Sequence, residues 1–198
     1  MNLITGMDTN GSLQAVAVTT SGEVKVVSSA GTAVIGKVII SQSAGNPSGT
    51  ITRPADTTAY AAGDGISTAA GANLTFATGL SEGSKFAIYS ARIRSDDAAV
   101  IAGATTYKLH LFNAAPTAIA DNAAHAVVTA DAAKYLGYIT LSAMEDVGDF
   151  INKRTDEINA VMSLAAAGTS IYGQLQTVGA FTPASGTVYT IELVLGAL

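Results

Sequence analysis

Apolar and polar residues alternate with a period of two over much of this chain. The clearest case is residues 187–195, where one face carries Tyr189, Ile191, Leu193 and Leu195. Because successive side chains of a strand point to opposite sides, this spacing predicts β-strands. Shorter runs with strand composition, separated by Gly, Pro, Asn and Asp turns, lie at residues 13–18, 23–27, 33–41, 50–53, 73–77, 134–142 and 169–178. Strands at such regular spacing predict an all-β fold, either a β-sandwich, a jelly roll or a barrel.

Residues 84–116 hold two further strand-like segments, joined by a connector that contains Gly103. The first segment is apolar on both faces at its start, and one face turns polar at Arg92 and Arg94. The second segment, residues 105–113, alternates in the same way. A two-stranded ribbon is not stable alone. We therefore expect these two segments to form a central ribbon that the remaining strands cover.

Two regions do not follow a simple strand pattern. Residues 142–145 match a capping box, with Ser followed three residues later by Glu, which predicts a short helix over residues 145–153. Gly148 weakens that helix. Residues 156–165 fit helical spacing and strand spacing about equally well, and periodicity alone leaves both open.

The chain divides into two parts by composition. Residues 43–49 form an uncharged, turn-rich segment that is typical of a linker. Residues 1–46 then form an N-terminal arm of short strands, or a small β subdomain, that contacts neighbouring subunits. Residues 50–198 form the β-sandwich or jelly-roll-like body.

Composition narrows the classes of function. The 198 residues include no cysteine, which excludes a disulfide scaffold, a thiolate zinc site and a cysteine nucleophile. Charged residues make up only 13%, and the abundance of small residues favours a compact surface suited to contact with other subunits. The formal net charge is −5 and no basic stripe occurs, so we expect no contact with nucleic acid.

The sequence has no signal-peptide pattern and no apolar run of about 18 residues, the length that a membrane helix needs. We therefore expect synthesis in the cytoplasm and no membrane contact.

No pattern of residues predicts catalysis, a metal or a cofactor. His110 and His125 are the only histidines, and no spacing brings them together with a carboxylate, so we interpret both as structural. The acidic doublets, which begin at Asp96, Glu145 and Asp156, sit beside turn residues where solvated carboxylates are common. Five aromatic residues are candidates for a sugar-binding platform, although such residues are more often core or interface anchors: Tyr60, Tyr135, Tyr138, Tyr172 and Phe181.

One segment is distinctive enough to suggest a family. Residues 51–64, ITRPADTTAYAAGD, resemble a segment that recurs in structural proteins of tailed bacteriophages. Further blocks follow in the order of that family, at residues 91–93, 107–116, 121–123, 135–139, 168–173, 180–183 and 188–191. The resemblance covers roughly residues 50–198. It implies a virion protein of the capsid decoration (cement) type with a β-sandwich body, and it favours a strand over residues 156–165.

The segment also has a physical interpretation of its own, as a structural corner. Pro54 follows Arg53 and ends a strand, and its missing N–H suits a sheet edge. Asp56 is placed to accept hydrogen bonds from the backbone of Thr57 and Thr58, as in an Asx turn. Three more residues complete this candidate site, with a buried aromatic ring followed by a chain reversal: Tyr60, Gly63 and Asp64.

The resemblance leads to a specific functional prediction. We expect a non-enzymatic protein that binds the outer face of the assembled phage head and bridges subunits of the major capsid protein. Closed symmetry at three-fold lattice positions favours a homotrimer over a dimer. The protein would be made in the bacterial cytoplasm and end on the outer capsid surface of the virion. The alternative is a tail- or vertex-associated module that recognises host glycans, and a glycan-cleaving enzyme is the least favoured class.

Overall fold

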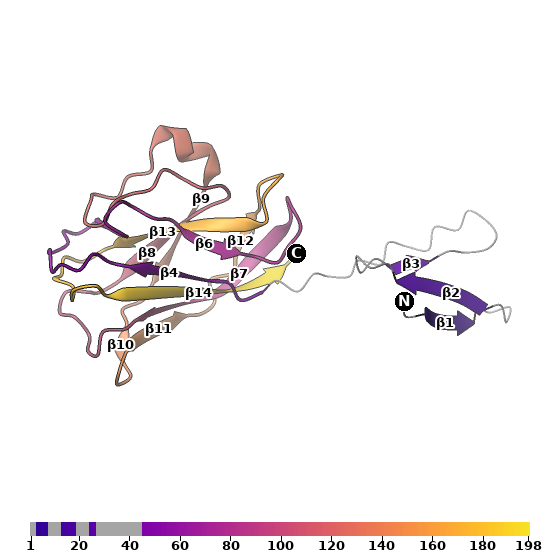
Figure 1. Cartoon of the computed structure of the whole chain (residues 1–198), viewed down its shortest axis with the longest axis horizontal. Helices are drawn as coiled ribbons and strands as arrows, with labels where there is room; N and C mark the ends of the chain where they lie inside the picture. Colours follow the sequence, from indigo (N-terminus) through magenta and orange to yellow (C-terminus); the bar gives the residue numbers. More distant parts are fainter. Residues whose placement is uncertain (1–2, 8–12, 19–23, 27–44) are drawn as a thin grey trace. The chain divides into compact units, whose positions relative to one another are not determined.

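The computed structural model describes residues 3–7, 13–18, 24–26 and 45–198 (Figure 1). The chain forms two compact units, Met1–Ser41 and Gln42–Leu198. In the first unit β1 (Leu3–Met7), β2 (Leu13–Val18) and β3 (Val24–Val26) form an antiparallel sheet in the order β1-β2-β3. The strands expected at residues 13–18 and 23–27 are therefore confirmed, and the strand expected at residues 33–41 lies outside the described residues.

The second unit consists of two antiparallel sheets that lie against each other (Figure 1). The six-stranded sheet has the order β10-β11-β7-β14-β4, with β12 also paired to β7. Its strands are β4 (Ser48–Thr52), β7 (Lys85–Ser95), β10 (Glu145–Asp146), β11 (Ile151–Thr155), β12 (Ala160–Ser163) and β14 (Val188–Ala197).

The five-stranded sheet has the order β5-β13-β8-β9, with β6 also paired to β13. Its strands are β5 (Gly65–Ile66), β6 (Leu74–Ala77), β8 (Tyr107–Phe112), β9 (Tyr135–Leu141) and β13 (Ser170–Thr177). A short 3₁₀ helix, η1 (Thr129–Lys134), precedes β9. The all-β, sandwich-like fold that the alternation predicts is confirmed.

The hydrophobic core lies between the inner faces of the two sheets. From the six-stranded sheet, Ile93, Ile191 and Leu193 are fully buried, and from the five-stranded sheet Leu109 and Leu111 are fully buried as well. These residues occupy alternate positions of their strands, as expected for side chains that face a common core. The described part of the chain contains no helix that is long and apolar enough to cross a membrane.

The expected central ribbon of residues 84–116 is wrong. β7 and β8 lie in different sheets, and the connector between them crosses from one sheet to the other. Each strand has partners on both edges, because β7 lies between β14 and β11, whereas β8 lies between β13 and β9. Two carboxylates anchor the crossover, since Asp96 Oδ1 accepts from the Val188 N–H (2.7 Å) and Asp97 Oδ1 from the Thr187 hydroxyl (3.1 Å).

A β-bulge explains why the first half of β7 is apolar on both faces. Ile88 pairs with Leu195 and Ser90 pairs with Val194, so Tyr89 is an extra residue without a partner on β14. Such a residue reverses the alternation of the strand. Before the bulge Phe86 and Ile88 face the core, and after it the core-facing positions pass to Ala91, Ile93 and Ser95.

The helix predicted over residues 145–153 is wrong, because this segment is the hairpin of β10 and β11. Gly148 adopts φ +116° and its N–H donates to Asp146 Oδ1 (2.8 Å), which makes a tight turn that a helix excludes. In this extended arrangement Ile151 is buried in the core. Residues 156–165 contain the strand β12, in agreement with the resemblance, after left-handed residues at Glu157 and Asn159.

Candidate functional site

The candidate corner of residues 53–64 contains a buried polar triad. Arg53 follows β4 and is buried, and its Nε donates to the Tyr60 hydroxyl. The Tyr60 hydroxyl donates to Asp121 Oδ1 (2.5 Å), and Arg53 Nη2 forms an ion pair with Asp121 Oδ2 (3.0 Å). Each of the three side chains therefore contacts the other two, and the buried guanidinium is compensated by a buried carboxylate.

The environment of the triad keeps Tyr60 protonated. Burial raises the pKa of Tyr60 far above its ordinary value, and the hydrogen bond to Asp121 raises this pKa further. The Arg53 guanidinium lies 4.8 Å from the centre of the Tyr60 ring, and Phe181 packs against that ring at a centroid distance of 5.0 Å. The triad thus links the chain after β4 to the loop that carries Asp121.

The other predicted corner residues shape the backbone. Asp56 Oδ1 accepts the Thr58 N–H (3.0 Å), which forms an Asx turn, and this hydrogen bond lowers the pKa of Asp56. The Pro54 carbonyl accepts the Asp56 N–H (2.8 Å). Gly63 adopts φ +95°, and Asp64 Oδ2 accepts the Ala61 N–H (2.6 Å). These backbone-shaping contacts around the buried triad support a structural corner.

Sequence reasoning missed Asp121 as the partner of Arg53. The loop that carries it runs beside residues 63–68, because the Gly65 N–H donates to the Ala123 carbonyl (2.8 Å) and the Asn122 N–H to the Gly65 carbonyl (3.0 Å). A carboxylate partner for Arg53 could have been expected, because a buried arginine is normally paired with a carboxylate. The sequence offers 15 carboxylates for that role and no spacing that selects this one.

The two histidines, which no sequence spacing brings together, lie against each other. The rings of His110 and His125 stack with centroids 4.0 Å apart. His110 Nε2 lies 3.1 Å from Gln176 Oε1, which can only accept, so this nitrogen carries the proton. His110 Nδ1 then accepts from the Tyr135 hydroxyl (3.0 Å). Neutral His110 therefore satisfies both of its ring nitrogens.

The surroundings of this histidine pair favour neutral rings. Burial lowers the pKa of His110, and burial, together with the repulsion between the two rings when both are protonated, lowers the pKa of His125 to about 4. The positive charge of Lys108, on the same strand as His110, also lowers the pKa of His110. Within residues 45–198 and the described strands of the first unit, no group of three or more His, Asp and Glu side chains is arranged to hold a metal ion. The pair is consistent with a structural role on the outer face of the five-stranded sheet.

The five aromatic candidates do not form one platform. Tyr60 and Phe181 are buried beside the triad, whereas Tyr138 is half-exposed on β9. The Lys108 ammonium lies 4.7 Å from the centre of the Tyr138 ring. The first two residues are therefore core anchors, as the alternative interpretation of these aromatics expected.

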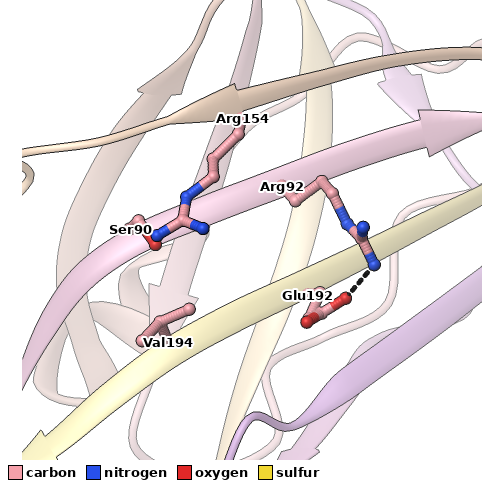
Figure 2. Close-up of a pocket in the computed structure, with 5 residues that line it drawn as sticks. All are labelled: Ser90, Arg92, Arg154, Glu192 and Val194. Atoms are coloured by element: carbon pink, nitrogen blue, oxygen red, sulfur yellow. Dashed lines mark hydrogen bonds and ion pairs between the residues drawn. The ribbon is translucent and has the colours of Figure 1, made fainter.

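A pocket that the sequence did not indicate lies on the outer face of the six-stranded sheet. It is lined by Ser90, Arg92, Arg154, Glu192 and Val194. Figure 2 shows both guanidinium groups turned toward β14, with the ion pair between Arg92 and Glu192. In the sheet register Arg92 lies directly opposite Arg154 on one side and Glu192 on the other. We call this the arginine pocket.

Comparison with known proteins does not assign the chain to a family. No protein-family model matches the sequence, and no curated protein matches it at a significant level. The resemblance to phage virion proteins therefore stays a prediction.

Proposed function

We propose that this chain is a non-enzymatic structural protein of a phage virion, a decoration protein that binds the outer face of the head and bridges major capsid subunits. The observation that carries the proposal is the outer face of the six-stranded sheet. Three of the four arginines in the sequence lie on it, whereas the fourth is buried in the corner. Those three are Arg92, Arg94 and Arg154.

Exposed apolar side chains accompany the arginines. Tyr89 is 44% exposed and Val161 is 66% exposed at one end of the face, and Phe150 lies beneath the Arg94 guanidinium near the other end. Arginine and aromatic residues are enriched at protein interfaces and among the residues that dominate binding energy. We call these six residues the arginine face, and its composition supports a protein-binding surface.

The proposed mechanism is stabilisation by mass action. A protein that binds only the assembled shell stabilises that shell by its binding free energy. An oligomer that contacts several capsid subunits gains further affinity through effective concentration. A trimer at three-fold lattice positions would provide such contacts, and the N-terminal strands are suited to pair with an edge strand of a neighbour.

The test is the copy number of this chain relative to the major capsid protein in purified particles, measured by quantitative mass spectrometry. We expect a ratio near one or a simple fraction of one. A handful of copies per particle would contradict decoration and support the tail- or vertex-associated recognition module instead. Absence from particles would contradict both.

A further inference from the structure

We infer that the arginine pocket binds a carboxylate, supplied by an Asp or Glu side chain of a partner protein. This inference deepens the proposed function, on which the identity of the partner as capsid protein rests. The assignment of a carboxylate as the ligand does not depend on that identity, because it is argued from the residues on the face of the six-stranded sheet.

The first argument is the pairing of like charges. Arg92 on β7 and Arg154 on β11 are directly opposite in the register. Like charges at such positions destabilise a sheet. Glu192 compensates the charge of Arg92 through an ion pair. Asp156 Oδ1 accepts a hydrogen bond from Arg154 Nε (2.6 Å). Asp156 is largely exposed, so solvent weakens its compensation of Arg154.

The second argument is an unpartnered hydroxyl inside the pocket. Ser90 is 2% exposed, and its Oγ has no hydrogen-bond partner among the described residues. A buried hydroxyl without a hydrogen-bond partner destabilises the folded chain. Ser90 lines the pocket, and in Figure 2 its oxygen lies beside the Arg154 guanidinium, so an acceptor that displaces this guanidinium would reach it. A ligand with acceptor oxygens would satisfy it.

The third argument is that both guanidinium groups keep N–H donors that are not used in their ion pairs. A guanidinium has five N–H donors in a planar fork that matches a carboxylate. Arg92 uses one nitrogen for Glu192, and Arg154 uses one for Asp156. The remaining donors of both side chains line a volume of about 80 Å³, which is larger than one water needs.

Charge and size together favour a carboxylate over a larger anion. The pocket lining carries two positive charges and one negative charge, Glu192, and the exposed Asp156 beside Arg154 compensates only part of the excess positive charge. A phosphate would bring up to two negative charges next to Glu192, whereas a carboxylate brings one. The exposed Tyr89 and Val161 on the same sheet face favour a protein side chain over a free small acid, because they offer apolar area to the rest of a partner surface.

The first experiment tests the pocket chemistry on the full chain. Arginine Nε–Hε NMR signals are followed while sodium acetate is added, with sodium chloride and sodium phosphate at equal ionic strength as references. We expect a saturable shift of Arg92 and Arg154 with acetate, and Ser90→Ala should weaken the acetate affinity about threefold or more. Equal shifts in chloride, or tighter binding of phosphate, would overturn the carboxylate assignment.

The second experiment tests the partner by adding purified protein to particles that lack it. Arg154→Gln should lower the affinity about tenfold, and Arg154→Lys should also lower it, because lysine keeps the charge and loses the fork. Lys108→Gln makes the same change of charge on the five-stranded sheet and should change affinity less than twofold. Far-UV circular dichroism verifies that each variant is folded.

The outcomes separate the two proposals. If the wild-type chain does not bind particles, the proposed function fails, whatever the acetate titration shows. If the wild-type chain binds and Arg154→Gln binds equally well, the proposed function stands and the assignment of the pocket to the capsid is overturned. Equal loss in Arg154→Gln and Lys108→Gln would show a general charge effect and would also overturn the pocket.

Discussion

At the scale of single residues, buried polar side chains are the least replaceable groups of the body. The Arg53–Tyr60–Asp121 triad joins the end of β4 to a loop that is 68 residues away from Arg53 in the chain. Breaking a buried ion pair by removing one partner leaves an uncompensated charge, which costs more than the pair contributes. The triad therefore makes a sharp prediction about stability.

We predict that Asp121→Asn lowers the free energy of unfolding by about 3–5 kcal/mol, because Arg53 stays buried without its counter-charge. Tyr60→Phe should cost less, about 1–3 kcal/mol, since it removes only a hydroxyl from the network. Denaturant unfolding followed by circular dichroism measures both values. The control is Asp56→Asn, at an exposed carboxylate that pairs with Arg53 only at 3.5 Å. An equal effect of Asp56→Asn and Asp121→Asn would contradict the role of the triad.

The stacked histidines predict a dependence of stability on pH. Burial holds the pKa of His110 below its ordinary value and that of His125 at about 4, so the unfolded chain binds more protons between pH 6.5 and about 4. The free energy of unfolding should therefore fall as pH falls through this window. We expect a loss of about 1–2 kcal/mol from His125, after allowance for its partial exposure.

Denaturant unfolding at several pH values between 7 and 4 measures this dependence. His125→Gln removes one titrating ring, and its stability should change less steeply with pH than that of the wild type. Carboxylates such as Asp131, whose pKa is lowered to about 2 by Lys134 and the Thr117 N–H, lose their stabilising contribution only below about pH 4. An unchanged slope in His125→Gln would rule out the histidine pair as the cause.

At the scale of elements, the crossover between β7 and β8 decides the architecture. It places two strands that are neighbours in sequence into different sheets, and the backbone must pass very close to residues 179–181 on the way. Gly103 makes this approach possible. It adopts φ +89°, and a Cβ at this position would lie 2.3 Å from the Ala180 carbonyl oxygen.

We predict that Gly103→Ala destabilises the protein by about 2–4 kcal/mol, from the left-handed backbone and the backbone clash together. Gly148→Ala is the matched control, because Gly148 also has a positive φ and its Cβ would meet no atom within 4 Å. That variant should cost only about 1–2 kcal/mol. Thermal and denaturant unfolding compare them, and equal costs would show that the close approach contributes nothing.

At the scale of the whole molecule, the chain forms two compact units. The described hydrophobic core lies entirely in Gln42–Leu198, between the two sheets of the sandwich. The arginine face and the corner triad belong to the same unit. The described core and the proposed carboxylate contact are therefore properties of the body.

We predict that residues 42–198 fold without the first unit, with one cooperative unfolding transition whose midpoint lies within a few degrees of the full chain. Differential scanning calorimetry of both chains measures this. Under the proposed function, the shortened chain should bind particles more weakly, because the arm supplies additional contacts that raise avidity. Unchanged particle binding would show that the arm takes no part, and an unfolded shortened chain would contradict the division into units.

The sequence alone determined the alternation of most of the longer strands, but it did not indicate β1, β5 or the β10–β11 hairpin. Burial on one face of a strand imposes a period of two that is visible over five to ten residues, and residues 187–195 or 73–77 show it without any knowledge of partners. The Asx turn at Asp56 was also predictable, because its hydrogen bond joins residues only two positions apart in the chain. The helix predicted over residues 145–153 failed because a capping-box match does not outweigh the burial of Ile151 in a sheet.

Only the tertiary structure decided which residues meet. The pairing of Arg53 with Asp121, the stacking of His110 on His125 and the arginine pocket all join residues that are far apart in the chain. These contacts depend on sheet order and register, and on the crossover between the sheets, because a shift of one residue turns every side chain of a strand to the other face. Alternation alone identifies a strand without specifying its neighbours, and for this reason the sites arise from the fold.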